Sequence, residues 1–280
     1  MEVLGDPNAM RAWSRGRRAN GATIAVVPTM GALHAGHLAL IDAAQRRASA
    51  VIVSIFVNPM QFDRAGDFDR YPRTLDADLA ACRAAGVHAV YAPTAATMYP
   101  PGFQTRVVPG ALAESLEGRM RPGHFEGVTT VVTKLLAAAV PDVAVFGQKD
   151  YQQLAVVRRM VADLDLGVEI VATPTVREPD GLALSSRNVR LSADDRAAAV
   201  VIPDALRAAA TAYAAGERDA ERLRGLVLDR VERQPRAMVE YVAVVDADTL
   251  APLAIIERPA VIVSAVWFGG VRLIDNSLLG

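Results

Sequence analysis

The stretch Ala22–His37, ATIAVVPTMGALHAGH, establishes the fold of the first half of this chain. It opens with Ala22–Val27, an apolar run without strict alternation, which is the pattern of a strand buried on both faces of a parallel sheet. A turn with proline and glycine interrupts the run, and a helical pattern then covers His37–Ala48. Strand, loop and helix in this order are the repeating unit of an α/β sheet.

The same unit recurs as far as about residue 175, with a cap-like Thr74 before one helix and Gly86 closing it. The repetition predicts a Rossmann-like, doubly wound parallel sheet over residues 1–175, which we expect to bind the ligands. The further predicted strands are Val51–Val57, Val87–Tyr91, Asp142–Phe146 and Val168–Ala172, and the further predicted helices are Leu75–Ala85, Val128–Ala139 and Asp150–Asp163.

The pattern changes over residues 176–280, which predict a second, smaller α+β domain. Ser192 is a plausible N-cap of a first helix, and Pro203 predicts a kink or break near Ile202. A second helix is expected over Ala220–Val231. The remaining apolar runs predict strands at Glu240–Asp246, Val261–Phe268 and Val271–Ile274.

Composition excludes several classes of protein. The 280 residues carry 30 basic and 31 acidic side chains, and this balance argues against a nucleic-acid partner. No apolar run approaches the ~20 residues that span a bilayer, and the N-terminus lacks the apolar core of a signal peptide. The single cysteine, Cys82, cannot form an internal disulfide, so we expect a cytoplasmic protein in which Cys82 serves packing. No cluster of metal-ligating residues is recognisable.

The first candidate site is the HxGH turn, Pro28–His37, which follows the first strand of the sheet. Ligands bind at the carboxyl edge of such sheets, and a helix N-terminus there favours phosphate. Gly31 and Gly36 let the backbone approach a ligand closely, and His34 and His37 can donate hydrogen bonds to phosphate oxygens. The alternative is two surface histidines beside a tight turn.

The second candidate site is Asn58 and Gln61, which follow the second strand. Their amides both donate and accept, so they suit a small polar substrate. The alternative is ordinary turn chemistry, for which Asn-Pro is common.

The third candidate site surrounds Lys149, one of only two lysines in a chain that otherwise uses arginine; the other is Lys134. Lys149 lies at a helix start, where the helix dipole disfavours a cation, and this suggests an anionic partner. Asp150 can simply cap the helix, Gln153 lies one turn further on, and Lys134 is interpreted as a solvated or snorkelling side chain.

The fourth candidate site is Ser185, Ser186 and Arg187, two hydroxyls and a guanidinium that could clamp phosphate if the segment closes over the site. The alternative is a hydroxyl-rich linker. Arg121 and His124 lie in a further loop, which could be a lid or simply surface.

Together these segments resemble the pantoate–β-alanine ligase family, within the wider HxGH nucleotidyltransferases. The resemblance covers most of the chain, and the NPMQF and KDYQQ segments narrow it to this family. The matching segments are PTMGALHAGH, SIFVNPMQF, YPRTLDADL, RPGHFEGVTTVV, FGQKDYQQL and DGLALSSRN.

The resemblance implies an AMP-forming ligase that joins pantoate to β-alanine through a pantoyl adenylate, uses ATP accompanied by Mg²⁺, and forms a homodimer. It implies catalytic roles for His37, His34, Lys149, Ser185, Ser186 and Arg187. Pantoate is expected at Asn58, Gln61 and Gln153, with β-alanine also at Gln61. ATP is expected at Met30, Gly31, Ala32, Leu33, His34, Ala35, Gly36, His37, Gly147, Gln148, Lys149, Asp150, Val176, Leu184, Ser185, Ser186 and Arg187.

This sequence departs from the family pattern at two of these positions. Leu184 stands where methionine is expected, a nearly volume-conserving exchange, and Ala35 stands where many members have glutamate. Two other functions use a similar turn: an adenylyltransferase whose product keeps the nucleotide, and an ATP-binding sensor without catalysis. Release of AMP only in the presence of β-alanine distinguishes the ligase from the adenylyltransferase, and pantoate-dependent exchange of diphosphate into ATP excludes the sensor.

Overall fold

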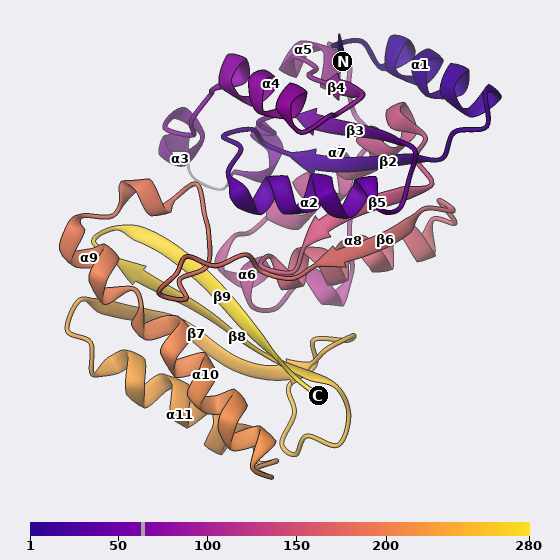
Figure 1. Cartoon of the computed structure of the whole chain (residues 1–280). Coiled ribbons are helices and arrows are strands. Elements are labelled where there is room, and N and C mark those ends of the chain that lie inside the picture. The colour runs from indigo at the N-terminus through magenta and orange to yellow at the C-terminus, as the bar shows by residue number, and fades with distance from the viewer. Residues whose placement is uncertain (63–64) are drawn as a thin grey trace. The chain divides into compact units, whose positions relative to one another are not determined.

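A parallel six-stranded sheet forms the first part of the protein (Figure 1). The structure is a computed structural model and describes residues 1–62 and 65–280. The strand order is β1-β4-β3-β2-β5-β6, and every neighbouring pair is parallel. The strands are β1 (Glu2–Leu4), β2 (Ile24–Thr29), β3 (Ala50–Ile55), β4 (Ala89–Tyr91), β5 (Val143–Gly147) and β6 (Glu169–Thr173).

Helices cover both faces of this sheet, and β2 shows why its sequence does not alternate. Ile24 and Val26 lie in a buried cluster with residues of α1, α7 and α8, whereas Ala25 and Val27 lie in a second cluster with residues of α2 and α4. Both faces of the strand are therefore apolar. The helices are α1 (Pro7–Ala19), α2 (Ala35–Gln45), α4 (Leu75–Ala84), α7 (His124–Ala139) and α8 (Tyr151–Asp163), with short segments η1 (Pro59–Gln61), α3 (Ala65–Asp69), α5 (Ala95–Met98), η2 (Ala111–Ala113) and α6 (Glu117–Met120).

The direction in which successive strands are added to the sheet reverses at its centre, between β2 and β5. From β2 the chain proceeds to its neighbour β3 and then to β4, whereas β5, on the other side of β2, leads outward to β6. The carboxyl ends of β2 and β5, at Thr29 and Gly147, therefore flank the point at which the winding reverses. Open α/β sheets bind their ligands at this point.

The chain divides into two compact units. The first contains residues 1–148 and 152–174, and the second contains residues 149–151 and 175–280. In the second unit, α10 and α11 pack against an antiparallel sheet of order β7-β8-β9. Its elements are η3 (Asn188–Arg190), α9 (Ala193–Ala198), α10 (Val201–Ala214), α11 (Ala220–Glu232), β7 (Ala237–Asp246), β8 (Ala260–Phe268) and β9 (Val271–Leu279).

The predicted fold class is confirmed, as are the predicted interruption of the helix near Ile202 and the N-cap at Ser192. The Ser192 hydroxyl accepts a hydrogen bond from the Asp195 N–H at 3.1 Å, and Pro203 lies in the first turn of α10, where a missing N–H costs little. Within the described residues no helix is long and apolar enough to cross a membrane.

Several boundaries differ from the predictions. β1 and α1 were not predicted, since β1 has three residues and α1 buries only Met10 and Ser14 beneath an arginine-rich surface. β9 continues five residues beyond Ile274 because Asp275 and Asn276 are buried polar residues that interrupt the apolar run. Thr74 precedes α4, but its hydroxyl does not cap the helix backbone.

Candidate active site

The backbone of the HxGH turn is held by Asp78, a buried residue of α4. One carboxylate oxygen of Asp78 accepts from the Ala32 N–H at 3.0 Å, and the other accepts from the Leu33 N–H at 2.8 Å. The Thr74 hydroxyl donates to the same carboxylate at 3.1 Å. A carboxylate that accepts three hydrogen bonds fixes the path of the turn, so Asp78 is a functional residue that the sequence analysis missed.

The turn also depends on a glycine. Gly31 has φ +81°, and a Cβ there would lie 2.9 Å from Asp78 Oδ2 and 3.2 Å from Ile55 Cγ2. Both the left-handed backbone and the close approach exclude a larger residue. Ala32 follows with φ +52°, a conformation that the two hydrogen bonds to Asp78 stabilise.

His34 and His37 together form the N-terminal cap of α2. His34 Nδ1 accepts from the Gly36 N–H at 3.1 Å, and His37 Nδ1 accepts from the His34 N–H at 3.2 Å. A ring nitrogen that accepts carries no proton, so this hydrogen bonding assigns the proton of each imidazole to Nε2. The two ring centroids lie 4.1 Å apart, so the pair presents neighbouring Nε2–H donors. Ala35 is exposed, so this position lies on the solvent side of the turn.

The Asn58 amide is fully engaged within the protein. Its Nδ2 donates to Gln61 Oε1 and to the Gly127 carbonyl, both at 3.0 Å. Its Oδ1 accepts from the Met60 N–H at 3.3 Å and from the Tyr99 hydroxyl at 2.7 Å. Burial raises the pKa of Tyr99, which keeps that hydroxyl a donor. Asn58 is only 1% exposed, and its amide holds the side chain of Gln61 in place.

Gln61 connects the second candidate site to the first. While its Oε1 accepts from Asn58, its Nε2 lies 3.1 Å from the Met30 sulfur, in the HxGH turn. The turns that follow β2 and β3 therefore meet, as expected of two neighbouring parallel strands. A thioether is a weak acceptor, so a stronger acceptor on a substrate could replace it.

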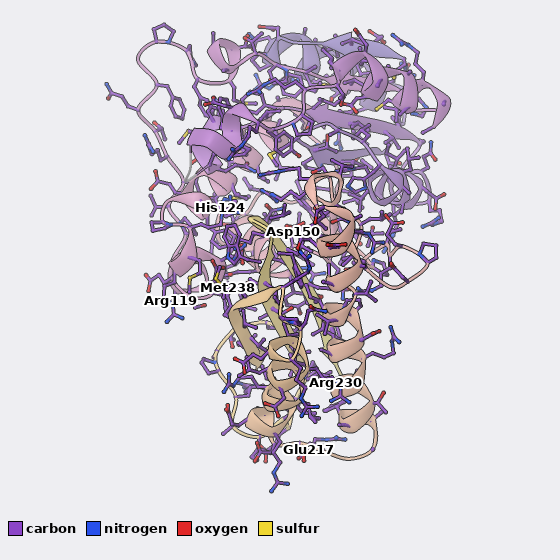
Figure 2. All side chains as sticks on the ribbon, turned by 90° about the vertical axis from the view of Figure 1, so that its left-hand side faces the viewer. Arg119, His124, Asp150, Glu217, Arg230 and Met238 are labelled. Atoms are coloured by element: carbon purple, nitrogen blue, oxygen red, sulfur yellow. The ribbon has the colours of Figure 1, made fainter. Side chains whose placement is uncertain are left out.

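The third candidate site follows β5, on the other side of β2. The Gln148 N–H donates to the Thr173 carbonyl at 2.8 Å, and a turn then leads into α8. Lys149 is half-buried and Asp150, labelled in Figure 2, is exposed. Lys149 belongs to the second unit, where its carbonyl accepts from Asn276 Nδ2 at 2.9 Å.

The adjacent glutamines of α8 have different environments. Gln152 is buried, and its amide accepts from the Glu117 N–H at 2.9 Å and donates to the carbonyls of Leu112 and Ser115 at 2.8 and 2.9 Å. Gln153 is half-buried, and its amide makes no hydrogen bond within the part of the chain that the structure describes. Of the two, only Gln153 has an amide that the described residues leave open to a ligand.

The fourth candidate site lies in the second unit. The Leu184 N–H donates to the Val176 carbonyl at 2.9 Å, so these two predicted residues are neighbours across a narrow loop. Arg177 anchors this loop through hydrogen bonds of 2.7 and 2.9 Å to the buried carboxylate of Asp275. Ser185 Oγ accepts from the Arg187 N–H at 3.2 Å. The segment is therefore an ordered turn that ends in η3.

The predicted residues thus form two groups. In the first unit the HxGH turn meets Asn58 and Gln61, with Gly147 at the end of β5 and Gln148 and Gln153 after it. In the second unit lie Lys149, Asp150, Val176 and Leu184–Arg187. Among the described residues no group of three or more His, Cys, Asp or Glu side chains could hold a metal ion.

Comparisons with known proteins give one consistent result. The family model described as Pantoate-beta-alanine ligase matches residues 2–278. A pantothenate synthetase from Chloroflexus aurantiacus is 55% identical over 266 residues, which are 95% of either chain. The crystal structure of pantothenate synthetase from Thermus thermophilus has a TM-score of 0.93 and 44% identity, over 99% of both chains.

A further solved structure contains ligands. The pantoate-β-alanine ligase of Francisella tularensis, complexed with β-γ ATP and β-alanine, has a TM-score of 0.80 and 34% identity, over 99% of this chain and 97% of that one. These matches extend over the whole chain and are not confined to the HxGH turn. This chain belongs to the pantoate–β-alanine ligase family.

Proposed function

We propose that this chain joins pantoate to β-alanine at the expense of ATP, through a pantoyl adenylate, and releases AMP and diphosphate. One observation carries the proposal: Gln61, held by Asn58, reaches the HxGH turn, whose backbone Asp78 fixes. Hydrogen-bond donors suited to phosphate and an amide suited to a carboxylic acid therefore lie next to each other at the edge of one sheet. The ligands of the Francisella tularensis relative agree with this chemistry.

In the first step, a carboxylate oxygen of pantoate attacks the α-phosphorus of ATP. A new P–O bond forms while the bond to the bridging oxygen breaks, and diphosphate leaves. Negative charge grows on the phosphate oxygens, where the Nε2–H groups of His34 and His37 and the Lys149 ammonium donate. Gln61 and Gln153 hold pantoate. In the proposal, Met30–Leu33, Gly147 and Gln148 line the ATP site and Asp150 binds the ribose.

In the second step, the free amine of β-alanine, which Gln61 also contacts, attacks the acyl carbon. The amide bond forms, the bond from the acyl carbon to the AMP oxygen breaks, and the nitrogen loses a proton. AMP is a good leaving group, so the protein needs mainly to orient the amine and exclude water. We assign the ATP and pantoate sites to residues 1–175 and a lid to residues 176–280. In the lid, Val176 contacts adenine and Leu184–Arg187 close on the phosphates.

Mg²⁺ fits this site as a companion of ATP. The described residues offer no carboxylate cluster of their own, and Mg²⁺ commonly binds through substrate phosphates with few protein ligands. When bound, the ion would neutralise phosphate charge, while the donors named above orient the α-phosphate. We also propose a cytoplasmic location and a homodimer; light scattering of the purified protein tests the homodimer.

The decisive assay measures AMP release with pantoate and ATP, in the presence and absence of β-alanine. A ligase releases AMP only with β-alanine and exchanges diphosphate into ATP in the presence of pantoate. An adenylyltransferase whose product keeps the nucleotide releases no AMP under either condition. A sensor shows neither AMP release nor pantoate-dependent exchange, and either result would overturn the proposal.

The two lysines provide a matched pair of variants. Lys149→Ala removes a proposed phosphate donor worth about 3 kcal/mol in the transition state, so we expect turnover to fall by about 100-fold or more. Lys134 belongs to α7, and its ammonium lies 5.2 Å from the centre of the Phe103 ring, so Lys134→Ala serves as the control. Equal turnover in the two variants would remove Lys149 from the mechanism.

A further inference from the structure

Arg121 and His124 converge on the main-chain carbonyl of Gln61. His124 Nδ1 lies 2.7 Å from this oxygen, and Arg121 Nη2 lies 3.1 Å from it. Arg121 Nη1 also lies 3.2 Å from His124 Nε2, so the three residues form a closed triangle of hydrogen bonds. His124, labelled in Figure 2, is the first residue of α7 and is 7% exposed.

The chemistry of the partners fixes the direction of each hydrogen bond. A carbonyl oxygen can only accept, so His124 Nδ1 carries a proton; a guanidinium can only donate, so His124 Nε2 accepts from Arg121. The ring is therefore neutral, in the tautomer opposite to that of His34 and His37. Glu117 Oε2, 4.0 Å from Arg121 Nη1, provides a counter-charge for the guanidinium.

The opposite side of Gln61 is fixed as well. Asn58 holds its side-chain amide and also donates to the Gly127 carbonyl. Gly127 approaches so closely that a Cβ there would lie 2.3 Å from the Met60 carbonyl oxygen and 2.7 Å from the Gln61 nitrogen. Both the backbone and the side chain of Gln61 are thus held against the first turns of α7.

We propose that Arg121 and His124 are positioning residues that fix Gln61 for the acid substrate. The inference rests on the proposed function, because it takes Gln61 as the residue that contacts pantoate. The two residues act through the Gln61 backbone and contact no substrate themselves. A misplacement of about 1 Å at a substrate contact can cost about 100-fold in rate, so a rigid support of this kind has a measurable effect.

The test compares His124→Ala, His124→Asn and Arg121→Lys with the wild-type enzyme in pantoate-dependent exchange of diphosphate into ATP. Loss of the hydrogen bond in His124→Ala should raise the KM for pantoate about tenfold and leave the KM for ATP unchanged. Asparagine places an N–H close to the position of Nδ1, so His124→Asn should recover most of the loss. Lysine lacks the planar guanidinium whose two terminal nitrogens lie against His124 and the Gln61 carbonyl, so Arg121→Lys should raise the same KM by a smaller factor.

The pattern of KM values distinguishes positioning from a folding defect. A smaller folded fraction lowers the apparent kcat and leaves both KM values unchanged. Arg119→Ala, an exposed arginine of α6, is the control for lost positive charge. If His124→Ala does not fold, Arg121→Lys decides the question.

An unchanged KM for pantoate in Arg121→Lys, and in His124→Ala if that variant folds, beside an active wild type, would overturn the inference. So would an equal rise in both KM values. Absence of pantoate-dependent exchange in the wild-type enzyme would instead refute the proposed function. The two failures are therefore distinguishable within one experiment.

Discussion

Replacement of Gly127 by alanine should displace the segment that carries Gln61. The new Cβ would lie 2.3 Å from the Met60 carbonyl oxygen and 2.5 Å from its carbonyl carbon, whereas ordinary contact begins at 3.4 Å. These are backbone atoms, which cannot rotate away, so α7 and η1 must separate by about 1 Å, enough for a loss of about 100-fold in rate. We expect kcat/KM for pantoate to fall by this factor.

The cost in stability follows from the same geometry. Overpacking costs about 1–3 kcal/mol, whereas a glycine-to-alanine change inside a helix normally gains about 1 kcal/mol. Gly16→Ala in α1 isolates the second contribution, because Gly16 has no atom within 4 Å of its added Cβ and belongs to the same unit. The helix-propensity gain cancels between the two variants, so Gly127→Ala should be about 1–3 kcal/mol less stable than Gly16→Ala.

Urea denaturation gives the difference in unfolding free energy, and the exchange assay gives kcat/KM for pantoate. Equal stability of the two variants would show that η1 moves away at no cost. Wild-type kcat/KM in Gly127→Ala would refute the claim that the position of Gln61 depends on the contact between these backbones.

Three further predictions concern Asp78, Arg177 and Cys82. Asp78→Asn replaces a carboxylate that accepts from two backbone N–H groups with an amide that can accept at only one of its two positions. The KM for ATP should therefore rise about tenfold or more. The control is Asp76→Asn, an exposed position on the same helix, which should leave this KM unchanged. Arg177→Met leaves the buried Asp275 carboxylate without its guanidinium partner. Urea denaturation should then show that the free energy of unfolding falls by about 3 kcal/mol. A fall of less than about 1 kcal/mol would contradict the anchoring role. Burial, with a smaller contribution from the nearby Asp78 charge, raises the pKa of Cys82 from 9.0 to about 11. The folded state therefore disfavours the thiolate, so the free energy of unfolding should fall as the pH rises from about 9 to about 11. Cys82→Ala should lessen that fall. A thiol reagent at pH 8 should label the protein only after unfolding.

The sequence was sufficient to predict those elements whose apolar pattern is set by burial. β2 and β3 are apolar because both faces of their sheet are covered, and α9 begins directly after Ser192 because the hydroxyl of that residue caps the helix. β1 and α1 escaped prediction because they expose most of their surface, and short or charged segments carry little periodicity.

The predicted site was incomplete where function depends on contacts distant in sequence. Asp78 looked like one acid among several at the start of a helix, and only the fold brings its carboxylate to the HxGH turn, 45 residues away for one of the two contacts. The Asn58 amide looked available for a ligand, but the fold surrounds it with four internal partners. A signal for Asp78 was present nonetheless, since the acid lies on the helix face that also carries the buried Cys82.

The different environments of Gln152 and Gln153 fix the number of residues in the turn before α8. Consecutive side chains of a helix point about 100° apart, so deletion of one residue from the turn before α8 would rotate each side chain into its predecessor's site. Gln153 would then enter the buried site of Gln152, and the apolar Leu154 would occupy the half-exposed position of Gln153. The number of residues between Gly147 and Gln153 therefore decides which side chain takes the half-buried position that the proposed function assigns to pantoate binding. Comparisons between distant members should find this spacing preserved even where the residues within it differ.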